Sequence, residues 1–428
     1  MFRLSMLSLS VLIENVKFYY AIILSEMKKN YFVSYIYVYI ALMPWNFFNG
    51  QMGILTGVLF AWWLKIGSEK GYFKKLKFIF YSKPFILFFL FVLLSYVSLL
   101  WTENFDYAIT SLKFYNYYFL MVPILFTSLT YQYAKNGLYV FLLSIGLYAL
   151  FSITIFLDIT TFIEGSTSED PKGILAYAIV TPYMAIGFFS SVVLAVFHRE
   201  TNLRFFFFGL GIVFLIGLFI NNGRAGQLSF FMTIIAFLVV YRKYFMSSKY
   251  FIGAIIICLG GLYSLHHLGK FDRVIMGINE IKNSEERQFE GSWGGRLYMW
   301  QIAFSLIHKE PFFGIGTGDT VDEIIKYGEK YPSQSSFVRG FHNQHLDILV
   351  KYGIVGYALF LMSILLLLYQ VREEVFFFPI GLLFFSVTLF DGIGDVILNM
   401  KPYTYVFMLF FIFLMVVIRD RNISLKSV

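Results

Sequence analysis

Long apolar runs alternate with short polar segments along most of this chain. An α-helix needs about 20 mostly apolar residues to cross the hydrocarbon core of a bilayer. The pattern predicts an all-α polytopic membrane protein with twelve spans. We expect them at residues 31–48, 51–67, 84–101, 115–131, 137–158, 174–197, 205–220, 225–241, 250–265, 344–370, 375–398 and 402–418.

Composition supports a membrane location. Of the 428 residues, 58% are hydrophobic and 14% are charged, and the mean hydropathy is +0.70. Soluble domains usually carry about 25% charged residues. The net charge of +8 does not indicate nucleic acid, because basic residues gathered on one membrane face give the same total. We therefore expect membrane lipids as surroundings and no nucleic-acid partner.

Basic residues in the loops predict the orientation. Among the terminal segments and the short loops, one alternate set contains nineteen lysines and arginines. The other set, without the long loop 266–343, contains only Lys113, Lys172, Arg224 and Lys401. Cytoplasmic loops are the ones enriched in basic residues, so both termini are predicted to be cytoplasmic. Residues 1–30 then form a cytoplasmic or interfacial segment, spans occupy 31–265 and 344–418, and 419–428 form a cytoplasmic tail.

Residues 266–343 form one long loop on the opposite, non-cytoplasmic side. A connection of this length usually has a function or is disordered. The spacing of apolar residues predicts a helix from Arg296 to His308, ended by Pro311. Its expected inner face comprises Leu297, Trp300, Ala303, Phe304 and Ile307.

A second helix is expected directly after this one. Gly314 to Gly318 predict a tight turn, and Asp319 is expected to cap a helix that runs through Lys326. We expect the two helices to form a lid over the bundle.

Candidate chemistry gathers where this loop enters the tenth span. A neutral histidine accepts a proton near neutral pH, so His342 is a candidate general base. His345 is a possible second functional histidine, and the alternative for both His342 and His345 is an interfacial polar cap. Asn343 is suited to orient a substrate or the loop, and Asp347 and Lys351 have the i, i+4 spacing of a helical ion pair.

Two arginines are candidate anion ligands. Arg224 lies in a short outer turn beside glycines, where it either meets a large partner or extends toward lipid headgroups. Arg296 begins the loop helix and is either a phosphate ligand or a solvated surface group. Gly316 and Gly318 belong to a turn that resembles a phosphate-cradling loop in composition only, and a structural turn is the alternative.

Other chemistry is less well supported. The sequence has no cluster with metal-ligand spacing, so neither a metal nor a cofactor is expected. The turn Asp391–Asp395 between the last two spans either contacts acceptor sugars or is an ordinary solvated turn.

These motifs together resemble a known family. His342-Asn343, nine residues, Gly353, two residues and Gly356 are similar to the signature of bacterial O-antigen ligases. Upstream, Gly295 to Ala303, Pro311 and the turn Gly314–Gly318 resemble the wider O-antigen ligase/polymerase family. The specific likeness covers about residues 290–360 together with Arg224.

The resemblance implies a metal-independent, inverting glycosyltransferase with a GT-C-like architecture in the bacterial inner membrane. Such ligases transfer a glycan from an undecaprenyl-diphosphate-linked donor to a lipid A-core sugar hydroxyl at the periplasmic face. His342 would be the base, and Arg224 and Arg296 would hold the diphosphate. Relatives often have Ser or Thr before the first arginine, whereas this chain has Gly223.

Three alternative functions remain open. An O-antigen polymerase uses the same donor but a lipid-linked acceptor, and a protein O-oligosaccharyltransferase modifies a Ser or Thr hydroxyl. A transporter of lipid-linked sugars would need charges near the membrane midplane and broken helices in two repeats. Here the charges lie at the outer surface, with Lys351 the main exception.

Overall fold

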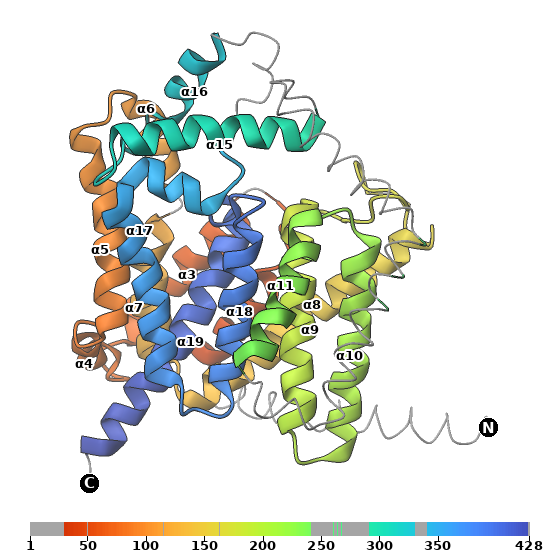
Figure 1. Ribbon diagram of the computed structural model, residues 1–428. Coiled ribbons are helices and arrows are strands. Elements are labelled where there is room, and N and C mark those ends of the chain that lie inside the picture. Colours follow the sequence, from red (N-terminus) through yellow and green to blue (C-terminus); the bar gives the residue numbers. More distant parts are fainter. Residues whose placement is uncertain are drawn as a thin grey trace.

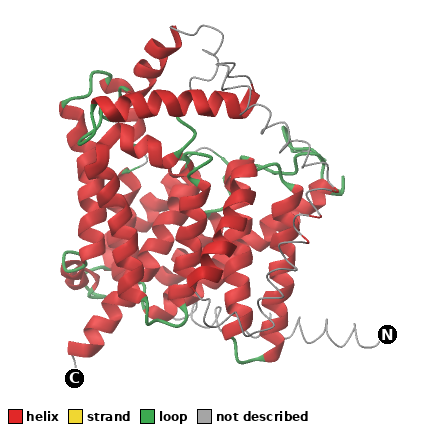
Figure 2. Cartoon of the chain, viewed as in Figure 1, coloured by secondary structure: helices red, strands yellow, loops and turns green. Residues whose placement is uncertain are grey.

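The computed structural model describes residues 30–48, 50–113, 115–161, 163–240, 260, 263, 267, 291–329 and 340–426. Over these residues the protein is helical, with turns between the helices and no strand (Figure 2). The long helices of the bundle are α2 (Tyr31–Leu42), α3 (Gln51–Ile66), α5 (Lys83–Val97), α7 (Asn116–Ser128), α8 (Tyr131–Phe156), α9 (Tyr177–Phe197), α10 (Thr201–Ile220), α11 (Arg224–Val240), α17 (Gln344–Val371), α18 (Phe377–Asp391) and α19 (Lys401–Lys426).

Seven further helices complete the part of the chain that the structure describes. They are α4 (Tyr72–Lys75), η1 (Leu76–Phe78), η2 (Ser98–Leu100), α6 (Phe105–Leu112), α15 (Gly291–Lys309), α16 (Thr320–Glu329) and η4 (Ile397–Asn399). The last of these follows α18, so the helix predicted over 375–398 ends seven residues early. Apolar residues of the following turn and of η4 extend the hydrophobic run beyond the helix itself.

Six helices of the described chain are long and apolar enough to cross a membrane. They correspond to predicted spans 3, 5, 6, 7, 10 and 12. Helices α2, α3, α11 and α18 are apolar but shorter. The predicted span 250–265 and the N-terminal segment 1–29 lie outside the described residues, apart from single positions in the former. The finding is therefore an all-helical protein with several candidate spans.

Helix α19 forms the centre of the bundle (Figure 1). Every side chain from Tyr403 to Arg419 is buried. Phe410 stacks parallel to Phe384 of α18 with a centroid distance of 4.0 Å. The helix continues to Lys426, beyond the boundary expected at 418, because Arg419 is itself part of the packed interior.

Helix α15 lies across one end of the bundle, and α16 lies beyond it (Figure 1). We call this end the α15 face. The buried side of α15 comprises Met299, Ile302, Ala303 and Leu306, which pack with Phe341 and with the start of α17. The predicted inner face was partly wrong, because Phe304 is 60% exposed. Helix α15 contacts α17 on one side and α16 on another, and this arrangement turns its buried stripe away from Phe304.

A break in α17 anchors the segment between α15 and α16. Gly353 has φ 63° and ψ −167°, a conformation that essentially only glycine adopts. The break leaves two carbonyls and two amides of α17 without helical partners. The carbonyls of Val350 and Lys351 accept from the amides of Ile315 and Gly316, at 2.9 and 3.1 Å.

The freed amides of α17 are satisfied by the same segment. Ile354 N–H donates to the carbonyl of Pro311 at 2.8 Å, and Val355 N–H donates to that of Phe312 at 3.2 Å. Buried backbone groups need such partners. The insertion of residues 311–316 into the break thus fixes the start of the segment that leads to α16.

Asp319 does not cap its own helix through its side chain as expected. Its carboxylate accepts from the amides of Glu103 and Asn104, at 2.9 and 2.8 Å, in the loop before α6. Its backbone carbonyl accepts from Glu323 N–H and so begins α16. The Asp319 side chain therefore joins the start of α16 to the loop before α6.

Candidate active site

His342 lies at the junction between the long loop and α17. Its φ of 45° is in the left-handed region, which side-chain-bearing residues adopt uncommonly. The side chain is 40% exposed, and its Nδ1 lies 3.7 Å from Oδ1 of Asp395. The imidazole therefore has one nitrogen beside a carboxylate and lies partly open at the α15 face.

The turn Asp391–Asp395 holds that carboxylate in place. Gln344 N–H donates to the carbonyls of Gly392, at 2.7 Å, and Asp395, at 3.2 Å. The Gln344 side-chain oxygen accepts from Leu398 N–H at 2.9 Å. These bonds join the first residue of α17 to both sides of the turn. Asp391, at the end of α18, is fully buried, whereas residues 393–396 of the turn are half-buried or exposed.

Asn343 and His345 have defined partners in the same segment. The Asn343 side chain accepts from the amides of His345 and Leu346, both at 3.0 Å, and so caps α17. His345 Nε2 lies 2.8 Å from the carbonyl of Leu389 and must donate to it. Its Nδ1 then accepts from the Tyr357 hydroxyl at 3.1 Å. Both nitrogens of His345 are engaged, which favours the structural interpretation of this residue.

Asp347 and Lys351 form the ion pair that their spacing suggested. Lys351 Nζ lies 2.8 Å from Asp347 Oδ2, and both side chains are less than 10% exposed. Asn399 donates to the same oxygen at 3.3 Å. The pair joins the start of α17 to the segment before α19. Removing one partner of a buried pair costs about 3–5 kcal/mol, so its role here is structural.

Arg224 begins α11 on the far side of the same turn. Its side chain is exposed. The next residue, Ala225, packs so closely on Gly394 that a Cβ added to Gly394 would lie 2.9 Å from the Cβ of Ala225. The turn that carries Asp395 therefore contacts both the His342 segment and the start of α11.

Arg296 lies in the second turn of α15 and is half-buried. One helical turn further, Trp300 Nε1 donates to the carbonyl of Phe341 at 3.1 Å. That bond joins α15 to the residue directly before His342. The described contacts thus bring the elements bearing Arg224, Arg296 and His342 together around one segment at the α15 face.

Comparison with known proteins identifies the same part of the chain. Residues 209–361, which include Arg224, Arg296 and His342, match the family model described as O-antigen ligase. Over these residues the chain is similar to the O-antigen ligase family. An uncharacterized protein of Haemophilus influenzae is 29% identical over 154 residues, which cover 34% of this chain. The match spans 38% of that relative's length. The family match supports glycan transfer of the ligase or polymerase type.

The glycine turn Gly314–Gly318, which lies within the matched segment, serves packing. Gly316 has φ 96°, and a Cβ there would overlap the side chain of Thr102. A Cβ at Gly318 would overlap the carbonyl of Asn104. Gly316 N–H already donates to Lys351, and Thr317 N–H donates to Ser98 Oγ at 3.3 Å. These amides are used to dock the turn, which leaves them unsuited to cradle a phosphate.

The sequence singled out Asp391 and Asp395 only as the ends of an outer turn and did not link either of them to His342. Asp395 and Asp391 both lie beyond the matched segment. Neither carboxyl oxygen of the fully buried Asp391 has a hydrogen-bond partner among the described residues. The only signal in the sequence was the pair of acidic residues flanking an outer turn. Nothing in their spacing linked them to a histidine some fifty positions earlier.

Proposed function

We propose that this protein is an O-antigen ligase. It would transfer a polysaccharide from undecaprenyl diphosphate to a sugar hydroxyl of the lipid A core. The observation that carries the proposal is His342, held at a loop–helix junction with Nδ1 beside Asp395 and within a segment that matches the ligase family. In this account the protein has twelve spans and a GT-C-like architecture in the bacterial inner membrane. The α15 face is periplasmic and both termini are cytoplasmic.

His342 is the general base of the proposed reaction. Asp395 faces Nδ1, so Nε2 takes the proton of the acceptor hydroxyl. A carboxylate beside one imidazole nitrogen fixes the tautomer and stabilises the imidazolium that forms. The hydroxyl oxygen attacks the anomeric carbon from the side opposite the diphosphate. Its bond to carbon forms as the carbon–oxygen bond to the diphosphate breaks, and the configuration inverts.

Arg224 and Arg296 bind the leaving diphosphate. The electron pair of the broken bond remains on the diphosphate oxygen, where negative charge develops. Guanidinium groups pair with phosphate oxygens through two parallel hydrogen bonds, and pre-positioned charge of this kind lowers the barrier. The chemistry then needs no metal. Among the described residues, no three His, Cys, Asp or Glu side chains meet as a possible metal site.

A gene deletion examined by lipopolysaccharide gel tests the proposed function. Loss of the whole polysaccharide ladder, with accumulation of long lipid-linked polymer, is the expected result. A core that retains a single repeat would instead indicate a polymerase. Repeats trapped on the cytoplasmic side would indicate a transporter. A normal ladder, together with a protein that has lost its O-linked glycan, would indicate a protein O-oligosaccharyltransferase.

A further inference from the structure

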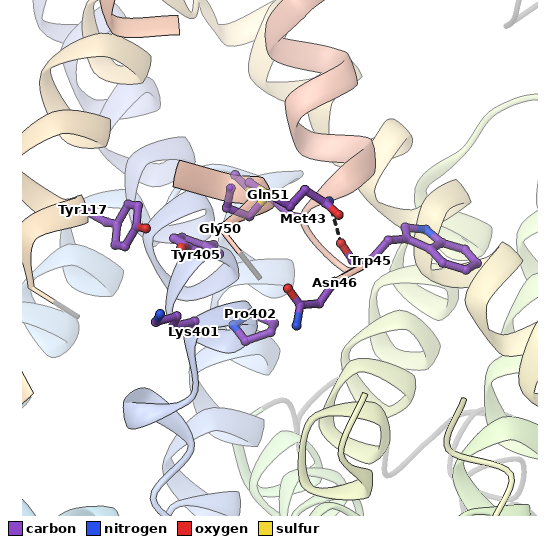
Figure 3. A pocket seen from close by; sticks show the side chains of 10 residues that line it. Met43, Trp45, Asn46, Gly50, Gln51, Tyr117, Lys401, Pro402 and Tyr405 are labelled. Carbon is purple, nitrogen blue, oxygen red and sulfur yellow. Dashed lines mark hydrogen bonds between the residues drawn. The ribbon is translucent and has the colours of Figure 1, made fainter. Parts of the chain in front are cut away.

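A polar pocket opens on the α15 face next to the candidate active site. It is lined by the loop between α2 and α3, by the start of α7 and by the start of α19 (Figure 3). The groups that suit a ligand are the Asn46 amide, the Lys401 ammonium, and the rings and hydroxyls of Tyr117 and Tyr405. An amide, a cation and aromatic rings together are suited to a charged saccharide rather than to a lipid chain.

The wall of the pocket is held by bonds that do not involve a ligand. The Gln51 side chain donates to the carbonyls of Leu42 and Trp45, at 3.1 and 2.7 Å, and accepts from Phe47 N–H at 3.0 Å. Trp45 Nε1 donates to Ser144 of α8 at 3.0 Å. These contacts fix the loop that presents Asn46. A wall held this way needs little ordering when a ligand binds, and this favours affinity.

Two tyrosines form the opposite side of the pocket. The Tyr117 ring meets the Tyr405 ring edge-on, with centroids 4.8 Å apart. Tyr405 is buried and Tyr117 is half-buried. Aromatic side chains with a polar end suit ligands that combine apolar carbon faces with hydroxyls. Sugar rings have both.

Lys401 supplies the charge. It is exposed, and no hydrogen bond or ion pair to it is found over the described chain. It is also the first residue of α19, where the helix dipole disfavours a cation. A bound anion would interact favourably with both the ammonium and the helix end. The pocket therefore favours an anionic ligand.

The pocket adjoins the His342 site through a short connection. Leu398 N–H is bonded to Gln344, and Asn399 is bonded to Asp347. Lys401 follows Leu398 by three positions, a span of at most about 11 Å. A more open depression that shares Asn46 continues along the same surface toward Lys172. A short stretch of chain thus joins the lining of the pocket to residues that contact the start of α17 beside His342.

We infer that the pocket binds a phosphate or carboxylate group carried on the saccharide of a substrate, with Lys401 as its counter-ion. This inference rests on the proposed function, because it assigns the ligand to the glycan that reacts at His342. The pocket encloses about 60 Å³. One water needs about 10–15 Å³ by the same kind of measure, so the space fits one such group and not a whole oligosaccharide.

Binding of glucose 6-phosphate to the full-length protein tests this inference. The protein is placed in nanodiscs of phosphatidylcholine, and Kd is measured for glucose 6-phosphate, glucose and inorganic phosphate. Glucose 6-phosphate should bind more tightly than either of the others. Lys401→Gln should weaken its binding at least tenfold and Asn46→Ala should weaken it less. Lys113→Gln, at another exposed lysine on the same side, is the matched control and should bind like the wild type.

Two results of this experiment would overturn the inference. One is a Kd for glucose 6-phosphate that is unchanged in Lys401→Gln. The other is an equal loss of affinity in Lys113→Gln, which would indicate a general effect of surface charge. A third arm replaces part of the phosphatidylcholine with phosphatidylglycerol. If that lipid displaces glucose 6-phosphate, a lipid headgroup occupies the pocket and the saccharide assignment is wrong. The binding assay needs no turnover and is therefore independent of the gene-deletion test. If the deletion abolishes the polysaccharide ladder but glucose 6-phosphate does not bind at Lys401, this inference is rejected and the proposed function is kept.

Discussion

The two ends of the bundle differ in how far their polar side chains are hydrogen-bonded or paired within the protein. At the end away from α15, Arg419 is buried and fully engaged. It donates to the carbonyls of Phe126 and Leu129 at the end of α7 and to Asp420, whose other oxygen accepts from Tyr131 N–H at 2.8 Å. At the α15 face, His342 keeps one ring nitrogen away from its carboxylate neighbour, and Lys401 has no partner among the described residues.

The difference separates groups that hold the fold from groups available to a ligand. Arg419 satisfies carbonyls that the end of α7 would otherwise leave unpaired, so its chemistry is complete within the protein. Asp347, Lys351, Asn343 and His345 do the same at the α15 face. His342 and Lys401 are not used in this way, and both are among the groups that we assign to function. The predictions below test this division, beginning with the largest expected effect.

Arg419→Met should cause the largest loss of stability. The change leaves two buried carbonyls and the Asp420 carboxylate without their partner, which should cost about 3–5 kcal/mol. A lower midpoint of thermal unfolding in detergent is the measurement. Arg421→Met, at the exposed arginine two residues later, is the control and should unfold like the wild type. Equal unfolding midpoints of the two variants would contradict the claim that Arg419 stabilises the fold.

Gly353→Ala should destabilise the α15 face. The native backbone conformation is strained for alanine by about 1–3 kcal/mol, and the new Cβ would overlap the backbone of Phe312. Residues 311–316 should then lose their backbone hydrogen bonds to α17. Faster proteolysis between α15 and α16 would reveal this loss. Gly57→Ala in α3 is the matched control, because a Cβ there meets open space. Unchanged proteolysis of Gly353→Ala would contradict the docking role.

Asp395→Asn should lower the rate of transfer by about tenfold to a hundredfold, or about 1.4–2.7 kcal/mol in activation free energy. The amide keeps the shape of the side chain but loses the charge that would stabilise a protonated His342. Its unfolding midpoint should stay near that of the wild type. A variant as active as the wild type would show that Asp395 does not assist His342.

Arg296→Lys should have the smallest effect of the four, about tenfold in the rate of transfer. The ammonium keeps the charge but cannot form two parallel hydrogen bonds to phosphate. Kinetics with a lipid diphosphate donor measure the change, and Arg421→Lys is the control. Rates equal to those of the wild type would argue against a diphosphate contact.

Much of the helical layout could be predicted from the sequence. Apolar runs place α3, α5, α7, α9 and α10 to within about four residues, because burial in the bundle and in lipid both select the same side chains. Helix α2 ends six residues before its predicted end, and α8 begins six residues before its predicted start. The end of α18 was misplaced, since apolar residues continue past Asp391 into the turn. The buried face of α15 was also partly misjudged. The contacts with α16 and α17 determine that face, and the spacing of apolar residues within α15 does not show which helices pack against it.

The candidate site was only partly visible in the sequence. The Asp347–Lys351 pair follows from local spacing in one helix. The partners of His345 are Leu389 and Tyr357, and the neighbour of His342 is Asp395, which local spacing cannot reveal. The role of the glycine turn depends on the break at Gly353, which joins two segments through backbone bonds. Contacts of this kind depend on the fold and not on residue type.

Single-turnover transfer by His342→Ala tests the central claim most directly. Purified protein in nanodiscs receives a lipid diphosphate donor and an excess of acceptor, and the first turnover is timed. General base catalysis contributes about 10²–10⁴-fold, so the rate should fall by that factor while the unfolding midpoint is retained. His308→Ala, at an exposed histidine of α15, should react like the wild type. A His342→Ala protein that turns over at the wild-type rate would contradict the assignment of His342 as the base.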